Sequence, residues 1–440
     1  MRPGRTARAL AALAAAAGLT AGLAAAARPA AADPLDEFGF GSAAAATAGA
    51  RTATATGPEA AHHNPGGVAL GDGPALLVGW GYGAMRLRIN GRDARVLDAH
   101  GTALGLAVPV ALDRDWTLGL GLALYLPDQF LARVQLIPQS EPHFILLDND
   151  PHRAVFEPVA ALAYRGRLGL GVGASILADA RSNKILFDVG VVGGEKVGQA
   201  ELDVELPVRL APLIGVWARP HDRVRAGLTY RGQLSLDLSL DILADVQIAG
   251  VVTGDVLVSL RASNYFTPAR VGGGLAVEVL PDLTLAADLT WNRWSAYPPA
   301  ADLAVLIALD IAPPLVSTEV PPAAFTDTVD GKLGVEYRRR GARTDVTVRA
   351  GGAWRPSPVP PQIGLTSWAD GDRVILTAGA GVTLADWAPV LTRPIDLDLG
   401  LQWHQVAHRL TRKHVETHPG QAFSSGGNLL HAGLSATVRF

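Results

Sequence analysis

From about residue 74 onward, apolar and polar residues alternate with a period of two over most of the chain. The clearest run spans residues 223–240, where nearly every even-numbered residue from Val224 to Leu240 is apolar and most odd-numbered residues are polar. This period predicts a strand with one oily face and one polar face. At roughly 3.3 Å per residue, such a run is long enough to cross the apolar core of a bilayer with tilt.

The same pattern predicts fourteen strands, joined by links that alternate in length. Short turns interleaved with longer loops are typical of a bacterial outer-membrane barrel, and an even strand number puts both ends of the barrel on the periplasmic side. The predicted fold is therefore all-β, a fourteen-stranded antiparallel transmembrane β-barrel. A secreted soluble β-protein is the alternative, but short and long loops would not alternate along its chain. The expected short links are 113–115, 165–167, 220–222, 281–282, 339–341 and 386–393, and the long ones are 128–152, 183–201, 241–255, 298–328, 356–371 and 411–427, with a shorter one at 89–100.

Aromatic residues near the strand ends predict two interfacial girdles, which a membrane barrel requires. The aromatic residues near short turns are Trp116, Trp217 and Trp387. Those near long loops are Tyr125, Trp291, Trp294, Tyr297 and Trp354.

Three segments divide the chain. Residues 1–32 have an Arg-bearing start, an Ala/Leu run and three alanines before Asp33, which predicts a signal peptide cleaved after Ala32; an uncleaved anchor is the alternative. Residues 39–70 lack both strand alternation and a wide apolar helix face, so we expect residues 33–72 to form a compact plug. Residues 73–440 are expected to form the barrel around it.

Composition excludes several functions. The chain has no cysteine, only 18% charged residues and a formal net charge of −3, so we expect neither disulfides nor nucleic-acid binding. His404 and His408 have the spacing of a zinc-protease motif, but Gln405 stands where the general base would be and the segment reads as a strand. We therefore expect no enzyme activity, no metal and no cofactor.

Three stretches together resemble one family, the FadL/TodX group of outer-membrane transporters for long-chain fatty acids and other hydrophobic compounds. Residues 39–70 are a run of small residues leading into Asn64-Pro65-Gly66, where the family has Asn-Pro-Ala. Residues 270–295 resemble its strand, turn and strand ending in an aromatic pair. Residues 348–360 resemble the stretch that ends in Ser-Pro-Val-Pro.

The resemblance implies a monomeric barrel in the outer membrane of a Gram-negative bacterium, closed by an N-terminal hatch. Its third strand would be kinked, opening a lateral gap through which an apolar solute passes into the membrane. We place the hatch turn at Asn64, Pro65 and Gly66, facing this gap. Gly66 should preserve the turn because glycine tolerates any backbone angle. The family's acidic pair is reduced here to Glu59, which argues against ion pairs between hatch and wall.

The lateral gap is expected in the third strand, residues 116–130, because glycine inside a strand marks a bulge or a close backbone approach. The residues assigned to it are Gly119, Gly121 and Pro127. The implied function is passive transport of hydrophobic compounds such as long-chain fatty acids, with a hydrophobic small molecule and membrane lipid as the only partners. A general porin and a structural or adhesive barrel are the alternatives.

Two sets of residues are candidates for contact with the solute. By parity Arg225, Arg231, Arg349 and His431 point into the lumen. One of them could pair with a substrate carboxylate or, instead, with an acid such as Asp237 or Asp288 across the lumen or with the plug. The outer loops carry apolar runs at 144–148, 185–192 and 302–315, which predict either a capture groove or a lid.

Overall fold

A computed structural model describes the protein. The described residues are 34–128, 141–148, 154–177, 180–181, 185–192, 195–202, 205–206, 209–248, 252–298, 301–309, 312–317, 323–364, 366–385, 393–413 and 422–440.

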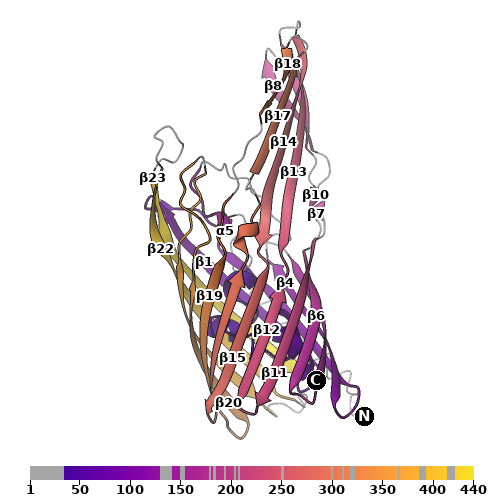
Figure 1. Ribbon diagram of the computed structural model, residues 1–440, viewed down its shortest axis with the longest axis vertical. Coiled ribbons are helices and arrows are strands. Elements are labelled where there is room, and N and C mark those ends of the chain that lie inside the picture. The colour runs from indigo at the N-terminus through magenta and orange to yellow at the C-terminus, as the bar shows by residue number, and fades with distance from the viewer. Residues whose placement is uncertain are drawn as a thin grey trace, which may run out of the picture.

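The fold is a closed antiparallel barrel (Figure 1). Fourteen strands follow one another around the wall in chain order, and β1 pairs with both β3 and β23, which closes the ring. The predicted fold class and strand number are confirmed. The barrel strands are β1 (Ala75–Ile89), β3 (Ala99–Ala111), β4 (Trp116–Pro127), β5 (Val155–Tyr164), β6 (Leu168–Leu177), β11 (Arg209–His221), β12 (Val224–Arg231), β15 (Arg270–Leu280), β16 (Leu283–Asn292), β19 (Thr328–Arg339), β20 (Thr344–Arg355), β21 (Arg373–Leu384), β22 (Ile395–Arg412) and β23 (Ala422–Arg439).

Alternation along the strands separates an apolar outer surface from the lumen. On β16, Leu289 is 64% exposed while its neighbour Asp288 is 3% exposed, because the leucine faces outward and the aspartate faces inward. Outward leucines recur on the other strands, so the wall presents an apolar surface suited to lipid. Within the described residues, no helix is long and apolar enough to cross a membrane.

A second antiparallel sheet extends from the long-loop end of the barrel, above the wall in Figure 1. It is built from segments expected to be loops, from the far half of the run at 223–240, and from residues 256–267, which lie outside the expected loops. That run is not one strand, since β12 ends at Arg231 and residues 234–248 leave the barrel as β13. A side chain at Gly232, between the two strands, would collide with Pro212, so only glycine fits this break. The second sheet contains β8 (Ile185–Val192), β9 (Glu195–Leu202), β13 (Leu234–Ile248), β14 (Val252–Thr267), β17 (Ala301–Leu309) and β18 (Ala312–Ser317).

Residues 34–74, called the N-terminal segment below, run inside the barrel. The short helix α3 packs on β21 and β22, and the 3-10 helix η3 packs on β4, β5, β6 and β11. The segment therefore reaches from one side of the wall to the opposite side. Its helices are α2 (Pro34–Phe38), α3 (Ser42–Ala46), η2 (Gly57–Glu59), α4 (Ala60–His63) and η3 (Pro65–Leu70); the remaining short elements of the chain are β2 (Arg92–Asp93), α5 (Ile145–Asp148), β7 (Ala180–Arg181), β10 (Glu205–Leu206) and η4 (Trp294–Ala296).

The predicted aromatic girdles are only partly present. Trp116, Trp291 and Trp354 are exposed on the outer surface of the barrel, as expected. Trp217 and Tyr125 are buried, because each has the parity of an inward residue. Trp294 and Tyr297 pack with Phe266 and Phe325 in an aromatic cluster at the long-loop end, and Trp387 lies outside the described residues.

Candidate functional site

The turn at Asn64 joins the N-terminal segment to the wall. The Asn64 side chain is fully buried and accepts a hydrogen bond from the Gly66 amide at 3.1 Å, which caps the start of η3. Its amide group donates to the carbonyls of Thr52, at 2.8 Å, and Val216, at 2.9 Å. One side chain thus fixes the turn, an earlier part of the segment and strand β11.

Glycines on both sides allow this contact. A Cβ on Gly66 would lie 2.7 Å from the carbonyl oxygen of Gly169 and 2.9 Å from the Trp217 amide nitrogen. On the wall, side chains at Gly171 and Gly215 would meet Pro65. The turn is formed with Gly66 in place, and the close approach of the wall leaves no space for a side chain at this position.

The turn does not face the third barrel strand. β4 pairs without a register shift with β3 from Thr117 to Pro127 and with β5 from Trp116 to Tyr125. A kink between Gly119 and Pro127 is therefore absent, and that prediction is wrong. Side chains at Gly119 and Gly121 would meet Ala69 and Val68, so these glycines make room for η3 instead of opening the wall.

The lumen is divided into two halves of different chemistry. The inward faces of β3, β4, β5 and β11 are largely apolar and pack with Phe40, Ala60 and Val68 of the N-terminal segment in one buried cluster. The inward faces of β16 to β22 carry charged and amide side chains. The apolar wall residues are Ala107, Ala123, Tyr125, Val155, Val159, Ala161, Ala163, Ala211 and Leu213, and the polar ones include Asp288, Asp330, Lys332, Glu336, Arg349, Arg373, Asp398 and Gln402.

One buried acid interrupts the apolar half. Glu157 on β5 is 1% exposed and pairs with Arg231 of β12 and with His62 of the N-terminal segment, the latter at 2.8 Å. Ser175 of β6 donates to the same carboxylate at 3.1 Å. The backbone pairing of β5 with β6 is interrupted at Glu157 and Pro158, because proline has no amide hydrogen to donate. Side chains therefore hold the two strands together where backbone pairing is missing.

A second acid attaches the segment to the charged half. Glu37 of α2 accepts hydrogen bonds from Arg373, at 2.6 Å, and Arg355, at 2.9 Å, while His404 lies at 3.4 Å. Burial opposes the charge on Glu37, but the two guanidinium groups prevail and hold its pKa well below the usual value. The expectation that the reduced acidic pair leaves no ion pairs between segment and wall is wrong, because Glu37 pairs with Arg355 and Arg373.

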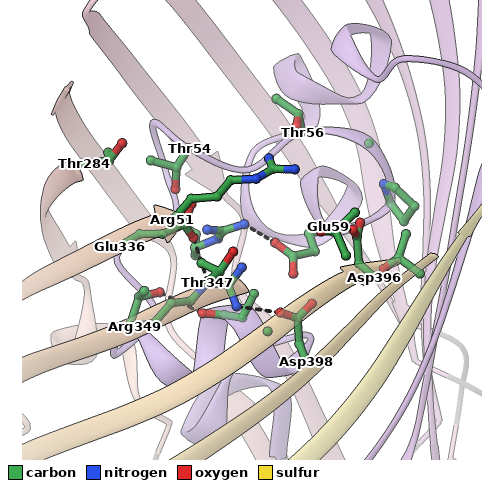
Figure 2. Close-up of a pocket in the computed structure, with 18 of the residues that line it drawn as sticks. Arg51, Thr54, Thr56, Glu59, Thr284, Glu336, Thr347, Arg349, Asp396 and Asp398 are labelled. Carbon is green, nitrogen blue, oxygen red and sulfur yellow. Dashed lines mark hydrogen bonds and ion pairs between the residues drawn. The ribbon is translucent and has the colours of Figure 1, made fainter. Parts of the chain in front are cut away.

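A polar chamber lies between the N-terminal segment and the short-turn end of the barrel. Figure 2 shows Arg51 and Glu59 of the segment beside Arg349 and Asp398 of the wall. Arg51 pairs with Glu59, and Arg349 bridges Glu336 at 2.7 Å and Asp398 at 2.5 Å. The chamber has a volume of about 350 Å³ and adjoins a second polar space of about 500 Å³. The lining offers an apolar solute little contact.

The four inward residues predicted to bind substrate are distributed among these sites. Arg231 pairs with Glu157 and Arg349 with Glu336 and Asp398, so neither partner is the expected Asp237 or Asp288. Arg225 lines the polar chamber and contacts the Thr284 hydroxyl at 3.4 Å. The His431 ring stacks on Phe38 with centroids 4.4 Å apart.

The residues expected as acid partners are also engaged elsewhere. Asp288 accepts a hydrogen bond from the Thr52 amide at 2.9 Å, and the side chain of Asp237 lies outside the description. Sequence reasoning missed Glu37, Glu157 and Trp217, whose indole donates to the Ala53 carbonyl at 2.9 Å. The alternation of residues along their strands marks Glu157 and Trp217 as facing the lumen, whereas nothing in the local sequence marks Glu37.

Of the apolar loop runs, only residues 144–147 have described side chains. Phe144, Ile145 and Leu147 are buried, so this run packs inward as a lid would. The side chains at 185–192 and 302–315 lie outside the description, although residues 185–192, 302–309 and 312–315 belong to strands of the second sheet. The described residues include no group of three or more His, Asp or Glu side chains that could hold a metal.

Comparison with known proteins identifies the family of this chain. The family model for "outer membrane protein transport protein (OMPP1/FadL/TodX)" matches residues 212–440. The chain belongs to the FadL/TodX family. Proteins of this family are transport channels of the outer membrane that carry hydrophobic compounds. A comparison with curated protein sequences finds no match.

Solved structures of FadL/TodX proteins share the whole fold. A Pseudomonas aeruginosa FadL homologue is 16% identical with a TM-score of 0.60, covering 91% of this chain and 98% of that one. The Pseudomonas putida toluene transporter TodX is 15% identical with a TM-score of 0.55, covering 91% and 98%. The Ralstonia pickettii toluene transporter TbuX is 17% identical with a TM-score of 0.51, covering 92% and 99%.

Proposed function

We propose that this chain carries hydrophobic compounds passively from the cell surface into the outer membrane. The division of the lumen is the observation that supports this proposal. Apolar residues on the inward faces of β3, β4, β5 and β11 can contact an apolar solute, whereas ion pairs occupy the opposite face. A general diffusion pore passes hydrophilic solutes through a water-filled lumen, so it does not require an apolar inner face covered by a buried segment.

In this proposal residues 33–72 act as the hatch and residues 1–32 are removed on export, after Ala32. The hatch is anchored at both sides of the wall, by Glu37 and by Asn64, and it fills the lumen between them. Mass spectrometry of the intact protein from outer membranes tests the cleavage, and a full-length chain would contradict it.

We place the exit in the side of the wall, on the apolar half. The polar chamber below the hatch disfavours a straight path for an oily solute, because charged groups there would have to be desolvated. The β5–β6 seam at Glu157 and Pro158 is where wall pairing is interrupted beside the apolar cluster. Phe156 on β5 is 40% exposed beside this seam and would meet the solute on the membrane side.

A disulfide across the seam tests the exit, and the absence of native cysteine simplifies the design. Pro158→Cys with Ala174→Cys would link β5 to β6 at the interruption. Leu162→Cys with Leu170→Cys, which face each other in the intact ladder, is the matched control. We expect oxidation to abolish uptake of a labelled hydrophobic compound only in the first pair, with recovery on reduction. Unchanged uptake in the oxidised first pair would exclude this exit.

The polar chamber is also the observation that favours the porin alternative. It is a wide polar space at one end of the barrel, which a small hydrophilic solute could enter. Planar-bilayer conductance separates the two functions, because a closed transporter gives little steady current and a porin gives large steady channels. Large channels from the intact protein would reject the transport proposal.

A further inference from the structure

A hollow lies on the outer surface of the barrel, across the neighbouring strands β1, β23, β22 and β21. It has a volume of about 640 Å³. Leu376, Trp403 and Leu430 in its lining are between 38% and 53% exposed, because they face the membrane and not the lumen. The outward residues that line it are Tyr82, Ala84, Leu376, Ala378, Leu401, Trp403, Leu430 and Ala432, with the inward residues Thr377, Gln402 and His431 behind them.

The strand register accounts for the hollow. Outward residues form two rows across the four strands, and each row sets alanine beside leucine or an aromatic ring. The side-chain volume that the alanines lack is the hollow. Because this face of the barrel is in contact with lipid, an acyl chain is the group available to fill it. The row nearer the long loops is Ala84, Leu430, Trp403 and Leu376, and the next is Tyr82, Ala432, Leu401 and Ala378.

Arginines border the hollow on the side of the long loops. The Arg86 side chain on the outward face of β1 is 57% exposed, and it lies 2.9 Å from a carboxylate oxygen of Asp98. Arg88 follows on the same face and is exposed; it forms no ion pair with the described residues, although Asp93 stands opposite it in the register of β1 and β2. Residues 86–98 contain four arginines and two aspartates, so this edge of the hollow carries a net charge of +2.

The rim continues with polar residues on β23 and β22. Asn428 and Gln405 form the part of the first row above the hollow that these two strands supply. A bulge in β22 then brings His408, which is exposed, over Gly426 of β23, since a Cβ on Gly426 would lie 3.1 Å from the His408 Cα. Gly426 is the residue opposite Arg88 on β1. The bulge therefore carries an imidazole toward the unpaired arginine.

A cationic rim above an apolar hollow matches a lipid that has a phosphate in its head and acyl chains in its body. Guanidinium groups bind phosphate oxygens through charge-assisted hydrogen bonds. Tyr82 and Trp403 flank the hollow, and such aromatic residues are typical of the membrane–water interface, which puts Arg86 and Arg88 at the depth of the lipid heads. The long loops of an outer-membrane barrel face the cell surface, so the lipid belongs to the outer leaflet.

We propose that the hollow binds one phosphorylated lipid of the outer leaflet, of the lipid A type, with an acyl chain in the hollow and a phosphate on Arg86 and Arg88. A second copy of the chain is a poorer match, because it would bring an equally cationic rim against this one. The inference does not depend on the proposed transport function, since the site lies outside the lumen.

Native mass spectrometry of the purified full chain in an uncharged detergent tests the site. The probes are lipid A with both phosphates and the same lipid after enzymatic removal of its phosphates. We expect the native protein to retain one phosphorylated molecule, and Arg88→Gln to weaken its binding about tenfold. Arg88 has no ion pair among the described residues to lose, so this variant should fold. Arg339→Gln is the matched control, because Arg339 is likewise exposed and without an ion pair among the described residues, but lies at the short-turn end of β19.

A second variant tests the acyl chain without changing a charge. Ala432→Phe fills the hollow and should also weaken binding of phosphorylated lipid A, whereas Ala287→Phe, at an exposed alanine of β16 outside the hollow, should not. Equal retention of the two probes by the native protein, or unchanged binding in Arg88→Gln or in Ala432→Phe, would overturn the inference. A dimer of the lipid-free protein that phosphorylated lipid A does not dissociate and that Ala432→Phe disrupts would assign the hollow to a second copy instead.

Discussion

Gly66 in η3 and Gly169 in β6 are in contact through their backbones, and a Cβ on Gly66 would lie 2.7 Å from the Gly169 carbonyl oxygen. A Cβ on Gly169 would in turn meet the Gly66 carbonyl. The two residues belong to the N-terminal segment and the wall, so closure of the barrel at this point depends on a missing side chain in each.

Replacement of Gly169 by valine should therefore detach η3 from the wall. Overpacking at a close contact costs about 1–3 kcal/mol, and the unattached segment would admit ions. We expect increased single-channel conductance in planar bilayers for Gly169→Val. Gly273→Val is the control, because nothing lies within 4 Å of a Cβ at that wall position. Equal conductance in the two variants would contradict this prediction.

Replacement of Asn64 by aspartate should weaken the same attachment by a different route. Aspartate retains the acceptor for the Gly66 amide but cannot donate to the carbonyls of Thr52 and Val216. Each buried carbonyl left unsatisfied costs about 1–3 kcal/mol. Amide exchange in η3 should accelerate, while exchange in α3, which packs on β21 and β22, should stay as it is. Uniform acceleration over the whole segment would indicate general unfolding instead.

The fold is largely predictable from the sequence because period-two alternation and loop length are local properties. The break between β12 and β13 is not, since leucines continue to alternate through residues 234–240 although the chain has left the barrel. The Asn64 turn was identified, but its partners were not. Arg231 pairs with Glu157, which is 74 residues away, and that pairing depends on the stagger between strands, which no local pattern reveals.

Acid should loosen the α2 end of the segment through Glu37. The pKa of Glu37 lies well below its ordinary value of 4.5, so its ion pairs stabilise the folded protein above that pH and the contribution declines as the pH falls below it. We expect the difference in thermal unfolding midpoint between the native protein and Glu37→Gln to be largest near neutral pH and to shrink below about pH 4.5.

His63 contributes in a different window and must be separated from this effect. Its ring is half-buried, and desolvation together with the neighbouring His62 holds its pKa well below the usual 6.5, so the folded protein loses stability as the pH falls below 6.5. That loss is common to the native protein and Glu37→Gln and cancels in their difference. A difference that stays constant from neutral pH to below pH 4.5 would contradict the assignment to Glu37.

Removal of the Glu157 charge should destabilise the β5–β6 seam. Breaking a buried ion pair from one side costs about 3–5 kcal/mol, because the partner charge remains buried. We expect Glu157→Gln to lower the midpoint of thermal unfolding, and the double variant Glu157→Gln with Arg231→Met to recover part of the loss. Measurement of the two single variants and the double variant gives the coupling energy. A double variant as unstable as the sum of the single variants would show that the two residues act independently.

The two halves of the lumen are held by forces that respond to different conditions. Apolar packing along β3, β4, β5 and β11 weakens on cooling and in denaturants, whereas the paired charges of β19, β20 and β22 respond to pH and less strongly to salt. A single solvent change therefore acts on one side of the barrel before the other. The two sides of the barrel therefore differ under stress: the apolar wall stays packed in acid, and the charged wall stays paired in the cold.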